Sequence, residues 1–453
     1  TFLKRPEPGF SRFREAEKVW RGPLGYSLDD YYRDLRRGGY SIARFHDGAF
    51  AWEDVEREKG VFDWSKMDVI EAGLRKNGLD PMFVFASHGV FRTKAHGDGN
   101  ETNWFVRVNS RRGGLGVMSK GKKRERLVYY HPRDTDWTDW VTAVVSRYHK
   151  TIRYWEIVNE PNGTVESAAA YAHYAELCYK AVKAIDPDSV VLGVCSTGDL
   201  GLDAASFFRE AGEAGAFKWL DAASFHPYQQ PLDVPGKDGE RALENLRRIC
   251  DKYRPGVPLW DTEVYYINAF TPEQTEAFKR YRKNPKDPTA RPRPDAARLR
   301  SWPAGNLIKR YAIDLGGNCV ASTPLQRDQH LAMGAGRETS ELELGVIGIP
   351  PVFAVNDRYF ANAAFARYLE GAKFLCKPDL PNGFNGFVFR DRHGQMVALV
   401  WRRPGEDPAS LRCPVGAVVR DLYGNRITRA AIDISAEPVY FFLTDDKSMA
   451  FAK

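Results

Sequence analysis

The sequence predicts an α/β fold in which a (β/α)8 TIM barrel is followed by a C-terminal antiparallel β-sandwich. Short apolar strands alternate with amphipathic helices through most of the chain, a rhythm typical of parallel βαβ units. After a helix expected at Asn362–Glu370, short strands separated by turns indicate an antiparallel sheet. With 453 residues and 43% hydrophobic composition, the chain can form one large and one smaller domain. We assign residues 1–372 to the barrel and residues 373–453 to the sandwich.

The expected barrel strands are short apolar runs that end near a polar residue or a turn. They are Tyr40–His46, Pro81–Ser87, Tyr154–Asn159, Val190–Cys195, Ala222–His226, Leu259–Glu263 and Asn318–Thr323. Counting back along the chain makes Tyr40–His46 the second strand of eight. The first strand is poorly marked, and we expect it near Gly9–Phe13 or before residue 1.

Helices between these strands begin at small or hydroxyl-bearing residues that favour helix N-termini. The pairs of starting residue and helix are Ser27 with Leu28–Arg37, Ser65 with Lys66–Asn77, Ser167 with Ala168–Ile185, and Gly239 with Glu240–Tyr253. The prolines among basic residues at Asn284–Pro294 predict an exposed loop.

The expected sandwich strands alternate in hydrophobicity and are joined by turn-forming residues. The strands are Gly386–Arg390, Met396–Trp401, Val418–Leu422 and Val439–Leu443, with turns at Asp391–Gly394 and Tyr423–Asn425.

The net charge of +7 is concentrated in the stretches Arg107–Arg126 and Lys279–Arg300. Both stretches fall between expected core elements, so one interpretation is a pair of solvated loops. The other is attraction to an anionic partner such as a uronic or sulfated glycan. Nucleic acid is a poorer candidate, because no DNA- or RNA-reading motif accompanies the charge.

The six cysteines are widely spaced and lack the CxxC pattern of a metal or redox site, so we expect mostly buried free thiols. No apolar run reaches the length of about eighteen residues that a transmembrane helix requires, which predicts no membrane partner. The first residues resemble neither an initiator segment nor a signal peptide. The compartment is undetermined, and secretion or periplasmic export with removal of a signal segment is compatible with the sequence.

The segment YWEIVNEPN at Tyr154–Asn162 is the most informative one. An apolar strand runs directly into an Asn-Glu-Pro turn, and Pro161 ends the strand. A carboxylic acid at the carboxyl end of a parallel strand projects onto the face where barrel enzymes keep their active sites. Glu160 is therefore a candidate general acid. The alternative is a capping turn with a surface glutamate.

A second carboxylate ends the segment PLWDTEVYY at Pro258–Tyr266. The intervening chain accommodates three βα units, which places Glu160 on the fourth strand and Glu263 on the seventh, facing each other across the barrel mouth. Two such carboxylates can flank a glycosidic bond, one protonating the leaving oxygen while the other attacks the anomeric carbon. Asp261 competes with Glu263 for the second role, but it lies one pleat deeper, and we expect it to be buried.

These two segments, at this spacing, resemble the acid/base and nucleophile strands of the retaining (β/α)8-barrel glycoside hydrolases of clan A, most closely family 39. Ala51–Trp64 is similar to the segment after strand two in several of its families, and DAASFHPY at Asp221–Tyr228 resembles strand six. Pro350–Leu375 and the following sandwich resemble the closing helix and accessory domain of such enzymes. The resemblance covers most of the chain.

The resemblance implies a role for several residues. It makes Glu160 the acid/base, Glu263 the nucleophile and Asn159 the donor to the sugar 2-hydroxyl. The remaining implied substrate-binding residues are His226 and Tyr228, at the site rim or supporting Glu263, and Arg44 and His88, near the base of the pocket.

Alternative roles are barrel packing or an ion pair with Glu156 for Arg44 and His88, and a core position for His226. The nucleophile must be ionised, and a neighbouring Arg44 or the Tyr228 hydroxyl would lower the pKa of Glu263. We expect Glu160 to occupy a drier environment that raises its pKa.

Two features depart from the clan pattern or extend it. Many members place a Trp at the end of strand eight, whereas Ala321–Gln326 reads ASTPLQ. The insertion Phe91–Pro132 is longer than a barrel loop requires and brings Trp104 together with the basic cluster. Long loops on this face shape specificity, so we expect Trp104 to contact substrate.

The sequence thus predicts a retaining glycoside hydrolase acting by double displacement on a plant, algal or microbial oligosaccharide or polysaccharide, without cofactor or metal. An acidic glycan is one option that the basic segments raise. The alternatives are a transglycosylase with the same residues and a non-catalytic carbohydrate-binding barrel.

Overall fold

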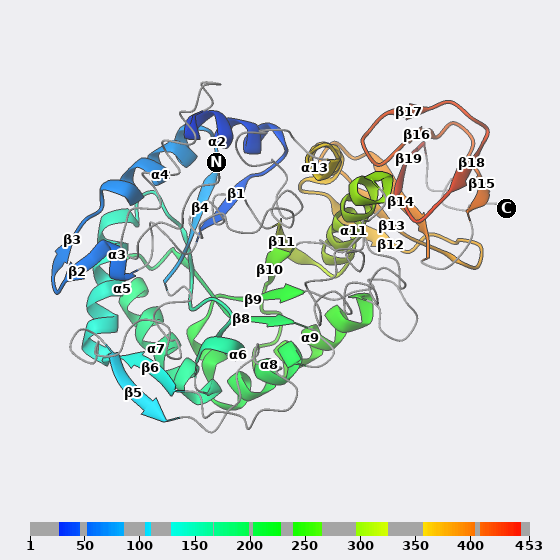
Figure 1. The fold of residues 1–453 in the computed structure, drawn as a ribbon. Coiled ribbons are helices and arrows are strands. Elements are labelled where there is room, and N and C mark those ends of the chain that lie inside the picture. The colour runs from blue at the N-terminus through cyan, green and yellow to red at the C-terminus, as the bar shows by residue number, and fades with distance from the viewer. Residues whose placement is uncertain are drawn as a thin grey trace, which may run out of the picture. The chain divides into compact units, whose positions relative to one another are not determined.

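The structure is a computed structural model that describes residues 27–45, 52–85, 105–109, 128–165, 167–198, 203–227, 239–264, 296–324, 357–403 and 408–444. The chain divides into two compact units. One contains the parallel sheet with its surrounding helices, and the other contains the C-terminal antiparallel sheets (Figure 1). A domain boundary at residue 372 stays a prediction.

The first unit is built on a parallel sheet of seven strands that follow one another in chain order. The strands are β1 (Ile42–Phe45), β4 (Asp80–Val84), β7 (Tyr154–Glu156), β8 (Val190–Gly198), β9 (Ala222–Pro227), β10 (Leu259–Val264) and β11 (Cys319–Pro324). Each neighbouring pair is parallel, and the first and last strands approach each other, so the sheet is a nearly closed (β/α)8 barrel. The positions expected for a first strand, near Gly9–Phe13, lie outside the described residues.

All the barrel strands predicted from apolar runs are present, with shifted ends. Three strand ends shift by three residues. β4 ends at Val84 rather than at Ser87, β7 ends at Glu156 rather than at Asn159, and β8 continues past Cys195 to Gly198. Positive φ angles at Val158 and Cys195 accompany the last two shifts.

Helices connect the strands around the barrel (Figure 1). They are α2 (Leu28–Arg37), α4 (Ser65–Lys76), α5 (Asp134–Tyr148), α7 (Ala168–Ile185), α8 (Asp203–Glu213) and α9 (Gly239–Tyr253), with the short turns α3 (Trp52–Val55), α6 (Pro161–Thr164) and η3 (Ala216–Trp219).

Two of the expected N-caps are confirmed. Ser27 accepts from the Asp30 backbone while the Asp30 carboxylate accepts from the Ser27 backbone, and the Ser167 hydroxyl accepts from Ala170. The predicted cap at Ser65 is wrong by one position, because Trp64 caps α4.

The segment Ala51–Trp64 has a packing role on the outside of the barrel. It forms α3 and the hairpin of β2 (Glu56–Glu58) and β3 (Val61–Phe62). Trp52 and Trp64 both stack on Trp140 of α5, with ring centroids 5.6 and 6.1 Å apart. These tryptophans therefore stabilise the core.

The insertion before α5 contains a second hairpin, formed by β5 (Phe105–Asn109) and β6 (Val128–Pro132). Trp104 and the basic residues Lys120–Arg126 lie outside the described part of the chain, as does the expected loop Asn284–Pro294.

The second unit contains α11 (Ala296–Gly316), α13 (Asp357–Leu369) and an antiparallel sandwich. Its larger sheet orders β12 (Lys373–Cys376), β13 (Phe384–Arg390), β14 (Met396–Arg402), β19 (Val439–Leu443), β16 (Val418–Arg420) and β17 (Arg426–Ile427). A two-stranded sheet pairs β15 (Ala409–Arg412) with β18 (Ala431–Ile434).

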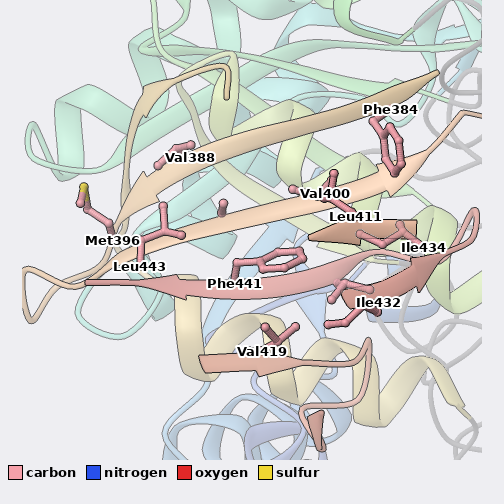
Figure 2. Packing of buried hydrophobic residues seen from close by; sticks show 12 residues of the cluster. Phe384, Val388, Met396, Val400, Leu411, Val419, Ile432, Ile434, Phe441 and Leu443 are labelled. Atoms are coloured by element: carbon pink, nitrogen blue, oxygen red, sulfur yellow. The ribbon is translucent and has the colours of Figure 1, made fainter. Parts of the chain in front are cut away.

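Buried aliphatic and aromatic side chains form the core of the sandwich (Figure 2). Val388, Val400 and Phe441 from the larger sheet belong to the same buried cluster as Leu411 and Ile434 from the smaller one. The predicted turns are confirmed: Asp391 accepts from the backbone of His393 and Gln395, and Asp421 accepts from its own turn in the same way.

None of the helices in the described ranges has the length and apolar character needed to cross a bilayer.

Candidate active site

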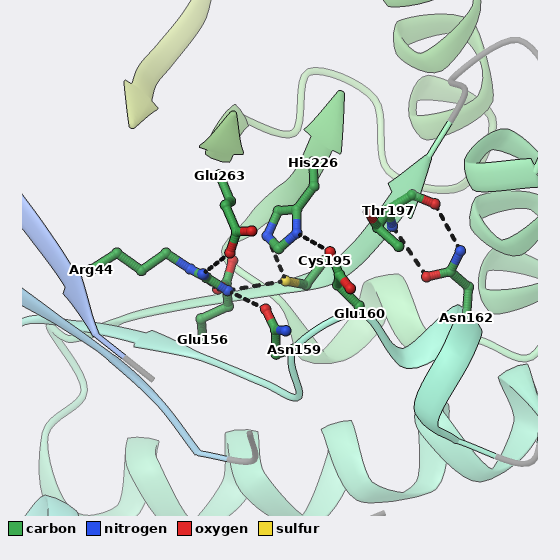
Figure 3. Close-up of polar contacts among 9 residues, drawn as sticks. All are labelled: Arg44, Glu156, Asn159, Glu160, Asn162, Cys195, Thr197, His226 and Glu263. Atoms are coloured by element: carbon green, nitrogen blue, oxygen red, sulfur yellow. Dashed lines mark hydrogen bonds and ion pairs between the residues drawn. The ribbon is translucent and has the colours of Figure 1, made fainter. Parts of the chain in front are cut away.

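The chain leaves β7 through an unusual turn. Val158 and Glu160 both adopt left-handed backbone conformations, with φ of 53° and 51°. Such conformations cost a non-glycine residue about 1–3 kcal/mol each and persist where surrounding contacts hold them, often at functional sites. Pro161 then starts α6 directly after Glu160. The turn replaces the last residues of the predicted strand and brings Glu156, Asn159 and Glu160 to the same end of the sheet (Figure 3).

A buried arginine on β1 joins three of the site's oxygen atoms. The Arg44 Nε donates to Glu156 Oε2 at 2.6 Å, Nη1 donates to Glu263 Oε2 at 2.8 Å, and Nη2 donates to Asn159 Oδ1 at 2.7 Å (Figure 3). Arg44 is 1% exposed. Burial by itself lowers the pKa of the guanidinium, but the adjacent acidic groups, with Glu156 first, raise it above its ordinary value. Arg44 therefore lies beside Glu263, as expected, and also forms the ion pair with Glu156 that was the alternative interpretation.

Glu156 is fully buried. Burial raises the pKa of its carboxyl, but Arg44 and His226 together lower it below its ordinary value. A charged Glu156 is therefore a fixed part of the site.

Glu160 and Glu263 approach each other from β7 and β10. A carboxylate oxygen of each and a ring nitrogen of His226 all lie within 4.8 Å of one another. The Glu160 side chain is 22% exposed and that of Glu263 is 10% exposed. Carboxyl groups about 5–5.5 Å apart are typical of enzymes in which one carboxylate attacks the sugar directly.

His226 on β9 connects Glu160 to a thiol. Its Nδ1 lies 3.1 Å from Glu160 Oε1, and its Nε2 lies 3.3 Å from Cys195 Sγ. The ring is completely buried, so His226 lies inside the barrel rather than at the rim. Burial lowers the pKa of His226, but the acidic groups Cys195, Glu263 and Glu160 raise it well above its ordinary value. The raised pKa and an acceptor atom beside each ring nitrogen favour a protonated ring that donates to both neighbours.

The electrostatics of Glu160 differ from the sequence expectation. Burial raises the pKa of its carboxyl as expected, and the charge of Glu263 adds to that effect. The hydrogen bond and charge of His226 outweigh both, so the pKa of Glu160 is lowered. The expectation of a raised pKa was wrong, because it did not include a cationic partner.

Asp261 is fully buried on β10, and its Oδ2 accepts from Ser322 Oγ at 3.2 Å. The buried position agrees with the expectation for Asp261. Its carboxylate bonds to a residue of the neighbouring strand β11.

Asn162 ties the site turn to the next strand. Its side-chain amide donates to the carbonyl of Thr197 at 2.8 Å and accepts from the Thr197 backbone at 3.1 Å (Figure 3). The contribution of Asn162 and of Cys195 to the site was missed in the sequence. The signal for Cys195 was available, since it ended a predicted strand on the face where the candidate carboxylates lie.

His88, Trp104 and Tyr228, the other expected site residues, lie outside the described residues. Their expected roles stay predictions.

Among the residues that the structure describes, two groups of side chains have potential metal-ligand atoms close together: Glu156 with Cys195 and His226, and Glu160 with His226 and Glu263. Arg44 already donates to Glu156, Glu263 and Cys195. This guanidinium neutralises the charge that a metal cation would need, so the donors are better explained by hydrogen bonding.

No protein-family model matches the sequence, and no curated protein matches it. The fold is similar to those of solved glycoside hydrolases. A family 39 glycoside hydrolase from Bacteroides cellulosilyticus superposes with a TM-score of 0.63 at 17% identity, covering 92% of this chain and 78% of that one. A family 39 β-xylosidase from Caulobacter crescentus gives 0.56 at 15% identity, covering 98% of both chains. The catalytic domain of a family 30 xylanase from Talaromyces cellulolyticus gives 0.54 at 12% identity, covering 96% of this chain and 92% of that one. The fold is thus the barrel-and-sandwich arrangement of these families.

Proposed function

We propose that the protein is a retaining glycoside hydrolase with Glu160 as general acid/base and Glu263 as nucleophile. The observation that carries the proposal is the approach of their carboxylates to within 4.8 Å at the carboxyl ends of β7 and β10. The similar folds of family 39 and family 30 glycoside hydrolases support it.

In the first step Glu263 attacks the anomeric carbon while Glu160 protonates the leaving oxygen. Arg44 donates to Oε2 of Glu263, so the guanidinium stabilises the ionised nucleophile. The sugar becomes an ester of Glu263, and the leaving group departs with the proton of Glu160.

The charge of Glu263 favours a protonated Glu160, whereas the hydrogen bond and charge of His226 favour its ionised form and lower its pKa. The general acid is therefore the protonated fraction of Glu160, which grows as the pH falls. His226 Nδ1 lies 3.1 Å from Oε1 of this carboxyl, which delivers the proton to the leaving oxygen.

In the second step Glu160 removes a proton from water, which attacks the glycosyl ester and releases Glu263. The charge of Glu263 raises the pKa of Glu160 in the free enzyme. Forming the ester removes that charge and lowers the pKa of Glu160, so the same residue changes from acid to base.

Asn159 is suited to bind the sugar beside the reacting carbon. Its Oδ1 accepts from Arg44, and this fixes the amide so that Nδ2 faces away from the guanidinium. An amide held in this way donates from Nδ2, which agrees with the role of donor to the 2-hydroxyl.

A screen of wild-type protein on aryl glycosides and defined polysaccharides tests the proposal, with Glu263→Gln as the inactive control. Hydrolysis by wild type and none by the variant is expected. Longer products instead of free sugar would identify the transglycosylase alternative. Binding without turnover in both proteins would identify a carbohydrate-binding barrel.

A further inference from the structure

Cys195 occupies a backbone irregularity inside β8. The neighbouring strand β9 pairs Ser224 with Val194 and Phe225 with Ser196, so Cys195 is the extra residue of a β-bulge. Its φ of 50° lies in the left-handed region that non-glycine residues seldom adopt. Bulges of this kind redirect a side chain. Here the fully buried thiol is directed between Arg44 and His226 (Figure 3).

The sulfur atom contacts both residues that orient the proposed catalytic carboxylates. Arg44 Nη2 donates to Cys195 Sγ at 3.6 Å, and His226 Nε2 lies 3.3 Å from the same atom. Arg44 also holds Glu263, and His226 also holds Glu160. Cys195 thus connects the nucleophile side of the site with the acid/base side through two hydrogen bonds on each side.

We propose that Cys195 is a positioning residue for the acid/base: its sulfur accepts a hydrogen bond from protonated His226, and it thereby sets the pH range in which Glu160 acts. This inference rests on the proposed function. Cys195 touches no reacting atom and acts through the imidazole ring.

The imidazole ring of His226 is fully buried. A buried imidazolium needs an acceptor at each nitrogen, and Glu160 and Cys195 supply them. Without the sulfur, the Nε2–H group of this fully buried ring loses its acceptor, which disfavours the charged ring. A neutral His226 can still donate from Nδ1 but carries no charge, so it stabilises the Glu160 carboxylate less and Glu160 keeps its proton to a higher pH.

The other charged groups around His226 and Cys195 do not change the direction of the expected pKa shift. Glu156 on β7 and Glu263 on β10 favour a charged His226, and Arg44 on β1 disfavours it. Tyr171 on α7 is close enough to Cys195 and Glu156 to interact with them electrostatically, but burial first and these two groups next raise its pKa well above the ordinary range, so its hydroxyl stays neutral. All of these groups are retained in a Cys195 variant.

The test compares wild type with Cys195→Ala and Cys195→Ser, with Cys250→Ala as the matched control. Cys250 is a buried thiol on α9 that belongs to none of the site's contacts described above. Two readouts are followed: the ring ¹⁵N shifts of His226 against pH, assigned with His226→Asn, and the pH dependence of kcat/KM. Cys195→Ala should lower the midpoint of the His226 titration and move the basic limb of kcat/KM to higher pH.

We expect each shift to be at least about 0.5 pH unit, equivalent to a change of about threefold in the protonation equilibrium. Cys195→Ser keeps an acceptor and should show smaller shifts, and Cys250→Ala should show none. In the His226→Asn background, Cys195→Ala should cause no further shift of the limb. Should the alanine variant fail to fold, Cys195→Gly, which also lacks an acceptor and accommodates the left-handed backbone at this position, decides by the same two shifts in the same directions.

A uniform loss of activity at all pH values with an unmoved His226 titration would overturn the proposal, since that is the result of a purely structural role. The nuclear magnetic resonance arm requires no substrate. Absence of glycoside turnover by wild type would therefore contradict the proposed function, while an unchanged His226 titration would contradict the role of Cys195.

Discussion

His226 Nδ1 lies 3.1 Å from Glu160 Oε1, so the proposed acid/base has a buried imidazole as its partner. The hydrogen bond and charge of this ring lower the pKa of Glu160 against the opposing effect of burial. A general acid must carry its proton at the start of the reaction. The pairing therefore has direct consequences for the pH dependence of catalysis.

The first prediction concerns the basic limb of kcat/KM. Because the pKa of Glu160 is lowered, its protonated fraction is lost as the pH rises through an acidic value, and activity should decline there. In His226→Asn the cation is absent, and the limb should move to higher pH. His173→Asn is the control, since His173 is an exposed residue paired with Asp134 on the outside of the barrel. An unmoved limb in His226→Asn would contradict the assignment of Glu160 as the acid.

The second prediction separates the two carboxylates. Glu263→Ala should have no measurable turnover, because the covalent intermediate cannot form. Glu160→Ala should lose about 10²–10⁴-fold on substrates with poor leaving groups and regain turnover with azide on substrates with good ones. Azide attacks the intermediate without needing a general base. The exposed Glu176→Ala on α7 should behave as wild type. Near wild-type rates for both site variants would show that another pair of residues performs the chemistry.

The third prediction concerns the buried ion pair. Arg44→Met leaves the fully buried Glu156 without its main cationic partner and should reduce the free energy of unfolding by about 3–5 kcal/mol. Adding Glu156→Leu removes the stranded charge and should restore much of the loss, as measured by urea unfolding at neutral pH. Neither protein should regain activity, since Glu263 still lacks Arg44. Equal stability of Arg44→Met and wild type would exclude this pairing.

The ion pair between Arg44 and Glu156 should also affect how the free energy of unfolding changes at acidic pH. The pKa of Glu156 is lowered in the folded protein, so its stabilising contribution is present above the ordinary carboxyl pKa and is lost as the pH falls through the lowered value. Wild type should therefore lose more stability on acidification than the Arg44→Met, Glu156→Leu double variant.

The fourth prediction concerns substrate charge. We propose that the preferred glycan carries uronate or sulfate and that the basic segment Lys120–Arg126 helps to bind it, since loops after barrel strands line the catalytic face. Changing Lys120, Lys122, Lys123 and Arg124 to Ser should lower kcat/KM on an acidic oligosaccharide and leave that on its neutral analogue unchanged. The loss should shrink at high salt. An equal effect on both substrates, or no loss at all, would contradict the idea.

The barrel strands were predictable because parallel strands are buried on both faces and therefore appear as continuous apolar runs. This pattern does not predict the backbone conformations of Val158, Glu160 and Cys195. Their left-handed backbones contradict local preference, and contacts from distant strands, above all with Arg44 and His226, accompany them. The short sandwich strands β12, β15, β17 and β18 were missed for a different reason, because two to four residues are too few to show a clear pattern. Glu160 and Glu263 were recognisable because each lies at or just after the end of an apolar run in the sequence, whereas their partners lie on other strands and are not marked by the local sequence.

The most direct test is to trap the intermediate with the 2-deoxy-2-fluoro glycoside of the sugar that the activity screen identifies, bearing a good leaving group. The fluorine slows both steps and the leaving group keeps the first one fast enough for the ester to accumulate. Mass spectrometry of the intact protein and its peptides should show one added glycosyl group on Glu263 in wild type and in Glu160→Ala, and none in Glu263→Gln. A label on another residue, or turnover with inversion at the anomeric carbon, would contradict the account.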